Sequence, residues 1–79
     1  MTATETQKLY LESRIEATKR QILASLHRSD EVIRSARRSL EKGAAPESAC
    51  EEIARTGTYA AQLARALREL TDFLKLMES

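Results

Sequence analysis

The chain has 79 residues, of which 42% are hydrophobic and 4% aromatic, and it contains no tryptophan. This length accommodates one domain without a deep core. The 13 basic and 12 acidic residues give a net charge of +1, which excludes a strong overall attraction to nucleic acid or an anionic membrane. The single cysteine, Cys50, excludes an internal disulfide.

The N-terminal sequence and the apolar content bear on location. Residues 1–8 lack the basic region and the apolar run of a secretory signal peptide. No stretch of the chain approaches the ~18 consecutive apolar residues that a membrane span requires. We therefore expect a cytoplasmic protein with no membrane span.

The first predicted element is a helix over about residues 3–42. Near its start, Thr2 is followed by Glu5 and Thr4 by Gln7. Both spacings fit the capping box, in which side chains bind the free N–H groups of the first helical turn.

A turn over residues 43–46 follows, and a second helix is predicted over about residues 47–77. Gly43 tolerates the left-handed conformation that commonly ends a helix. Pro46 suits the beginning of the next helix, since the N–H that it lacks has no helical partner there. The two helices should therefore fold back on each other.

Each predicted helix carries an apolar stripe at helical spacing. On the first helix the stripe is Leu11, Ile15, Thr18, Ile22, Leu26, Ser29, Ile33, Ala36 and Leu40. On the second helix it is Ala49, Ile53, Thr56, Ala60, Leu63, Leu67, Leu70, Leu74 and Met77. In an antiparallel arrangement the two stripes match end to end, with Leu26 opposite Leu63 and Leu40 opposite Ala49. The expected fold is therefore all-α, a two-helix antiparallel coiled-coil hairpin formed by a single domain, 1–79.

A pair of helices buries only one stripe on each, so a single copy should be marginally stable. We expect the hairpin to dimerise into a four-helix bundle. A second stripe on the second helix consists only of small residues and is the expected oligomer interface: Cys50, Ala54, Gly57, Ala61 and Ala64. Glycine inside a helix costs about 1 kcal/mol relative to alanine, so helix propensity alone does not explain Gly57. The alternative is a partly solvated flank of alanines.

Basic residues gather on the first helix, where they form a ridge: Arg28, Arg34, Arg37 and Arg38. Such a ridge can follow the phosphates of a nucleic acid, and this is one alternative function. The other interpretation is structural, because the expected hairpin places carboxylates of the second helix opposite the basic side chains. These pairs are Arg38 with Glu51, Arg37 with Glu52, and Lys42 with Glu47.

The ends of the two helices distant from the turn carry bulky side chains that form a candidate docking site for another protein: Leu9, Tyr10, Phe73 and Met77. They equally fit the closing layer of a dimer.

His27 shares a face with Asp30 and Glu31, but the residues expected opposite, 58–62, include no metal ligand. We therefore expect no metal, no cofactor and no small-molecule substrate, and the absence of a catalytic constellation indicates that the protein is not an enzyme.

Residues 22–40 resemble the middle of a SNARE motif. The residues that fall at compatible spacings are Leu23, Leu26, Glu31, Ile33, Ala36 and Leu40. Ser29 occupies the position where that family carries its central glutamine, and the heptads stop at the turn. The resemblance implies a SNARE-like or tether-like coiled-coil component.

From the residues themselves, the expected function is a protein-protein interaction module, a small assembly subunit or regulator that contacts itself and another protein.

Overall fold

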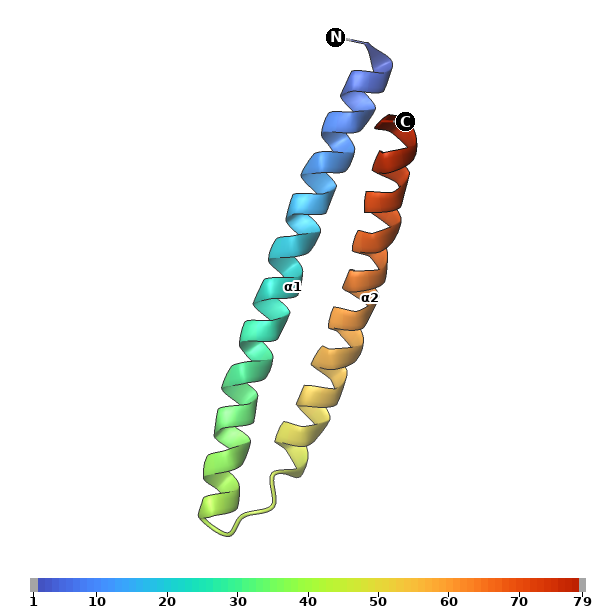
Figure 1. Ribbon diagram of the computed structural model, residues 1–79. Coiled ribbons are helices and arrows are strands. Elements are labelled where there is room, and N and C mark those ends of the chain that lie inside the picture. The colour runs from blue at the N-terminus through green and yellow to red at the C-terminus, as the bar shows by residue number, and fades with distance from the viewer. Residues whose placement is uncertain (1, 79) are drawn as a thin grey trace.

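The computed structural model describes residues 2–78; residues 1 and 79, the ends of the expected domain, lie outside the described residues. Two helices, α1 (Ala3–Glu41) and α2 (Glu47–Glu78), run in opposite directions and pack side by side (Figure 1). The molecule measures 62 × 16 × 15 Å. The all-α class and the packing of two helices against each other are confirmed, and both helices end within one residue of the expected limits.

The beginning of α1 satisfies a free N–H group through a side chain, and the first hydrogen bond of α2 starts from Pro46. The Thr2 hydroxyl oxygen accepts a hydrogen bond of 3.2 Å from the backbone N–H of Glu5, as the capping pattern predicts. The alternative cap, Thr4, lies inside the helix. At the start of α2 the carbonyl of Pro46 accepts from the N–H of Cys50 at 3.0 Å.

The end of α1 is a glycine-terminated turn. Gly43 adopts a φ of 82°, which residues with a Cβ rarely adopt. Its N–H donates to the carbonyl of Leu40 at 3.0 Å, and the N–H of Ala44 donates to the carbonyl of Ser39 at 2.9 Å. These two bonds form a Schellman motif, which satisfies carbonyls that have no partner within the helix.

The contact between the helices follows a strict heptad on both. The expected stripe of α2 faces α1 and is partly buried throughout: Ala49, Ile53, Thr56, Ala60, Leu63, Leu67, Leu70, Leu74 and Met77. On α1 the buried residues are Leu11, Ile15, Thr18, Ser25, Val32 and Ala36. Strict 4-3 spacing keeps a stripe against its partner along the whole left-handed pair.

The expected stripe of α1 is wrong at Leu26 and Leu40, in its half near the turn, whereas Ala36 is buried as expected. Leu26 and Leu40 are 53% and 61% exposed, and Ile33 is only partly buried. Ser25 and Val32 lie between the helices instead. The reason is geometric, because a stripe that continued through Leu26 would drift around α1, away from the line that meets α2.

The expected register between the helices is also wrong. The expected register places Arg28 opposite Ala61. In the structure Arg28 pairs with Glu52, which lies more than two helical turns closer to the connection between the helices. At the other end Lys8 Nζ lies 3.4 Å from a carboxylate oxygen of Glu78. The connection over residues 42–46 runs along the pair instead of closing it symmetrically, so the end of α1 reaches beyond the start of α2 (Figure 1).

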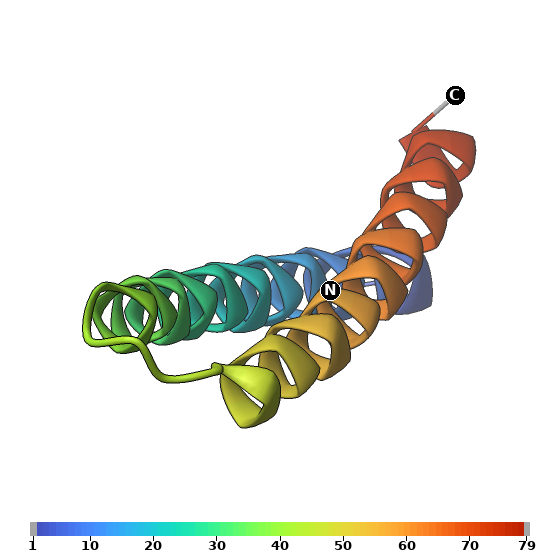
Figure 2. The same ribbon diagram turned by 90° about the horizontal axis from the view of Figure 1, so that it is seen from below.

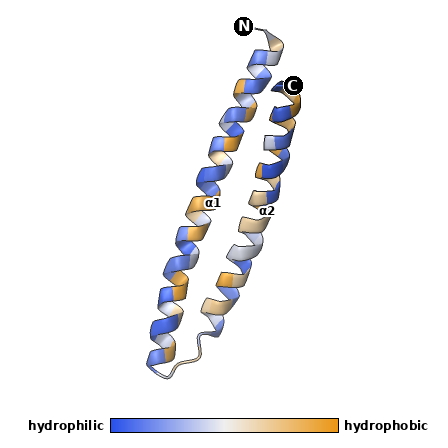
Figure 3. Cartoon of the chain, in the orientation of Figure 1, coloured by the Kyte–Doolittle hydropathy of each residue, from blue (hydrophilic) through white to orange (hydrophobic). Residues whose placement is uncertain are grey.

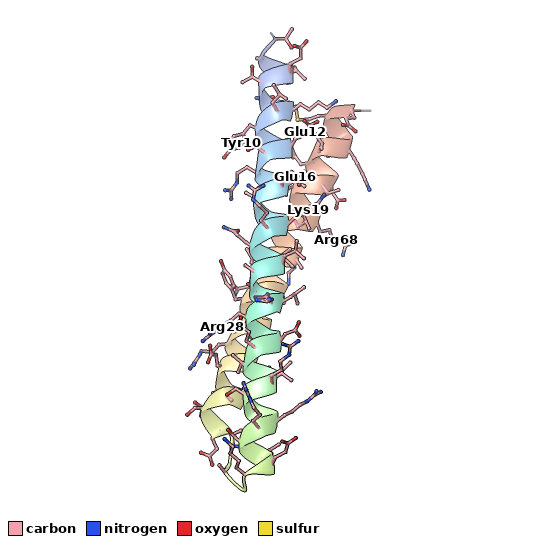
Figure 4. All side chains as sticks on the ribbon, turned by 90° about the vertical axis from the view of Figure 1, so that its left-hand side faces the viewer. Tyr10, Glu12, Glu16, Lys19, Arg28 and Arg68 are labelled. Atoms are coloured by element: carbon pink, nitrogen blue, oxygen red, sulfur yellow. The ribbon has the colours of Figure 1, made fainter. Side chains whose placement is uncertain are left out.

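The two helices cross at an angle. Figure 2 shows their axes diverging when the hairpin is seen from below. With α1 in front, α2 lies on one side of it near the turn and on the other side near the C-terminal end (Figure 4). This is the left-handed sense that heptad stripes produce.

Apolar residues are interspersed with polar ones along both helices (Figure 3). Within residues 2–78, neither helix combines the length and the apolar content needed to cross a lipid bilayer.

Candidate functional site

The contact between the helices divides the outer surface of the hairpin into two long faces. In an antiparallel pair, a local two-fold axis perpendicular to the plane of the two helices relates one helix to the other. Rotation about this axis does not exchange the two faces. Equivalent heptad positions of α1 and α2 therefore lie on the same side of the contact. Figure 4 shows this division. Glu16, Lys19 and Arg68 project to one side, whereas Arg28 projects to the other.

Nearer the turn, the side marked by Lys19 continues as an apolar surface, which we name the Leu26 face. Leu26 follows Lys19 by one heptad, and Ile33 and Leu40 follow at the same interval. Leu23 lies one turn before Leu26, at the outer edge of this surface, and is 65% exposed. The leucines that α1 does not use against α2 therefore gather on one side of the hairpin.

The α2 half of the Leu26 face has only small side chains. It consists of the expected interface residues, all of which are exposed: Cys50, Ala54, Gly57, Ala61 and Ala64. A Cβ at Gly57 would meet no atom of the chain within 4 Å. Nothing within the hairpin therefore requires glycine at this position, although it weakens the helix by about 1 kcal/mol relative to alanine. The large residues of α1 and the small residues of α2 together form one surface.

Farther from the turn, the same side of the hairpin is charged. Glu12, Glu16 and Lys19 of α1 line a shallow groove with Thr71 of α2. Lys19 Nζ lies 3.3 Å from a carboxylate oxygen of Glu16. Arg68 projects to this side as well (Figure 4), and it forms no ion pair with any residue of 2–78. The apolar Leu26 face thus continues into a surface that carries both signs of charge.

The opposite side, which we name the Arg28 face, holds the strongest polar contact between the helices. Nε and Nη2 of Arg28 donate hydrogen bonds of 2.9 and 2.6 Å to the same carboxylate oxygen of Glu52. Nη1 of Arg28 also lies 3.8 Å from Glu31. Arg28 is therefore engaged in holding the hairpin and is not a free member of the basic ridge.

The other arginines of the ridge point away from the helix contact. Arg34, Arg37 and Arg38 are exposed and form no ion pair within residues 2–78. The expected cross-helix pairs are wrong, because α2 is displaced along α1 relative to the expected register. None of them forms within the described part of the chain: Arg37 with Glu52, Arg38 with Glu51, or Lys42 with Glu47.

The four bulky residues expected to form a docking site do not share one face. Tyr10 projects to the side of Arg28 and is 65% exposed (Figure 4). Leu9 follows the heptad line of the other side, and Met77 is partly buried between the helices. Phe73 borders a shallow groove near the C-terminal end of α2. A docking role for each of them stays a prediction, but they do not form a single patch.

His27 lies 3.1 Å, through Nε2, from a carboxylate oxygen of Glu31 one turn along α1. Within residues 2–78, no three His, Cys, Asp or Glu side chains gather closely enough to hold a metal ion. The thiol of Cys50 is exposed on the Leu26 face.

The leucines of the Leu26 face are functional candidates that the apolar pattern alone missed. Hydrophobicity favours Leu26 over Ser25 for a place between the helices, and Ile33 over Val32. The signal that identifies the correct set is the 4-3 spacing of Leu11, Ile15, Thr18 and Ile22, which leads to Ser25 when it is continued without change.

Comparison of the chain with protein-family models, with curated proteins and with solved structures finds no match.

Proposed function

We propose that this chain is a non-enzymatic protein-protein interaction module, a small helical-hairpin assembly subunit or regulator that acts by packing its helices against others. Its first partner is a second copy of the chain, and the product is a four-helix bundle in the cytoplasm. The proposal requires no cofactor and no small-molecule substrate. Its main support is the Leu26 face, where Leu23, Leu26 and Leu40 stay exposed on one side of α1, with Asp30 and Arg37 on the same side.

The surface area of the hairpin supports the same conclusion. The accessible surface is 6171 Å², whereas a compact monomer of 8.9 kDa exposes roughly 4800 Å². A specific interface of standard size buries about 800 Å² on each partner. The excess therefore suffices for such an interface. The apolar residues buried within the hairpin are few, namely Leu11, Ile15, Val32 and Ala36.

The mass in solution tests the proposal. Ala61→Arg places a long charged side chain among the small residues of the Leu26 face, so we expect sedimentation equilibrium to shift from dimer to monomer. The matched control is Gln62→Arg, which adds the same side chain at the next exposed position, away from this face, and should leave the dimer intact. A native chain that stays monomeric at high concentration would contradict self-association.

Nucleic-acid binding is the second candidate, because Arg34, Arg37 and Arg38 are exposed without carboxylate partners in the described chain. The test is retention on immobilised DNA and RNA at low and moderate salt. Binding through phosphates weakens steeply with salt, and Arg34→Ala with Arg38→Ala should abolish it. Retention that survives both changes would contradict this alternative.

A SNARE-like or tether-like component is the third candidate. Like the main proposal, this alternative requires additional helices to complete a bundle, but these helices come from other proteins. Under this alternative the purified chain is a monomer that gains helix only with its partners. Under the main proposal the chain associates with itself.

A further inference from the structure

We infer that two hairpins join through their Leu26 faces with their turns at the same end, related by a two-fold axis parallel to the long axis. This inference rests on the proposed self-association and specifies its geometry. Such an axis preserves height along the bundle and exchanges the arms. The α1 helix of one copy therefore lies over the α2 helix of the other.

The sizes of the side chains are complementary in this arrangement. Ser25 and Thr56 line one groove and so lie at similar heights, and the residues that follow them are Leu26 and Gly57. Leu26 of one copy then projects onto the small residues around Gly57 of the other. The two-fold axis repeats the contact, as an isologous interface requires. The absence of a side chain at Gly57 gives the leucine room to approach the backbone.

The charges are complementary as well. Glu16 and Lys19 line a groove with Leu67, so Glu16 and Arg68 lie at similar heights on the same side of the hairpin. Exchange of the arms places Glu16 of one copy over Arg68 of the other. In this way Arg68, which has no ion-pair partner within residues 2–78, faces a carboxylate.

The opposite orientation, with turns at opposite ends, lacks both features. When the two hairpins overlap along their full length, it sets the leucines of the Leu26 face against the half of the other copy that carries Glu12, Glu16 and Lys19. Covering charged groups with apolar side chains removes their hydration without a compensating partner, which is unfavourable. The distribution of residues along the face therefore selects the orientation.

Charge reversal at the two proposed partners provides the test. Glu16→Arg and Arg68→Glu, prepared as separate proteins, each create two like-charge contacts in a homodimer. We expect each to weaken dimerisation by about tenfold relative to the native chain. Arg65→Glu, one turn before Arg68 and on the outward surface of α2, makes the same charge change and should not alter the dimer.

Mixing the two variants is the decisive measurement. In the mixed dimer one contact joins the two substituted side chains, which again carry opposite charges, and the other contact is the native pair of Glu16 with Arg68. An equimolar mixture should therefore recover native affinity as a heterodimer. An effect confined to one chain cannot be rescued by a second chain, so recovery in the mixture supports the inference. Weakened variants that fail to recover on mixing would overturn the proposed pairing.

Two further outcomes overturn the inference, and they are distinguishable. If both variants dimerise like the native chain, self-association stands but uses another surface or orientation. If the native chain itself shows no dimer, the inference fails together with the proposed self-association. Circular dichroism of each variant before mixing establishes that the helices are intact.

Discussion

The guanidinium of Arg28 on α1 donates two hydrogen bonds, of 2.9 and 2.6 Å, to one carboxylate oxygen of Glu52 on α2. This contact joins the helices on the side opposite the Leu26 face, near the turn. Both side chains remain partly exposed, so the pair fixes the alignment of the helices more than it stabilises them.

Arg28→Ala should therefore reduce the free energy of unfolding by no more than about 1 kcal/mol. Chemical denaturation of Arg28→Ala, Glu52→Ala and the double variant measures the coupling between the two side chains. Arg34→Ala, which removes an arginine without an ion pair in the described chain, is the control. A coupling energy well above about 1 kcal/mol would contradict this limit.

Ile15→Ala should reduce the free energy of unfolding by about 2–4 kcal/mol, since Ile15 is among the few apolar side chains buried between the helices. Tyr10→Ala, at an exposed position of the same helix, should change it by less than about 0.5 kcal/mol. Thermal and urea denaturation monitored by circular dichroism provide the comparison. Equal effects of the two substitutions would mean that Ile15 is not buried as described.

Gly57→Ala should affect helix stability and dimerisation in opposite directions. The added methyl group meets no atom of the chain and favours the helix by about 1 kcal/mol. The same group occupies the space that the second copy is proposed to enter, so the dimer should dissociate more readily. Both effects are measured on one series of protein concentrations. Circular dichroism gives the helix content at low concentration, and sedimentation equilibrium gives the mass at high concentration. Tighter dimerisation of Gly57→Ala would argue against a close approach at this position.

Gly43→Ala should destabilise the hairpin by about 1–2 kcal/mol, because the φ of 82° forces the new Cβ against the backbone. Ala45→Gly is the control, because it changes another residue of the same connection. It tests whether the loss of stability arises from the backbone conformation at Gly43 or from any substitution in the turn. Denaturation midpoints of both variants give the answer. An unchanged midpoint for Gly43→Ala would contradict the left-handed turn.

The helices, the turn and the entire stripe of α2 follow from the sequence. Thr2, Gly43 and Pro46 mark the helix limits through local backbone chemistry, and local chemistry does not depend on the rest of the molecule. On α2 only one set of large apolar residues keeps heptad spacing, since the second stripe consists of small residues, so hydrophobicity and geometry agree.

On α1 hydrophobicity and heptad spacing disagree, so the sequence pattern does not identify which residues face α2. Leu26 is more hydrophobic than Ser25, yet Ser25 continues the heptad and is the residue that meets α2. Two adjacent stripes on one helix do not reveal which of them faces the other arm. The alignment of the arms likewise depends on the path of residues 42–46 in space, which residue spacing does not encode.

The slender outline of the hairpin governs how its size can be measured. A radius of gyration of 18.0 Å far exceeds the roughly 12 Å of a compact chain of this length. A rod tumbles and diffuses as a larger particle than its mass implies. A single copy should therefore elute from a gel-filtration column ahead of globular standards of equal weight, and light scattering on the eluting peak separates extended shape from true association.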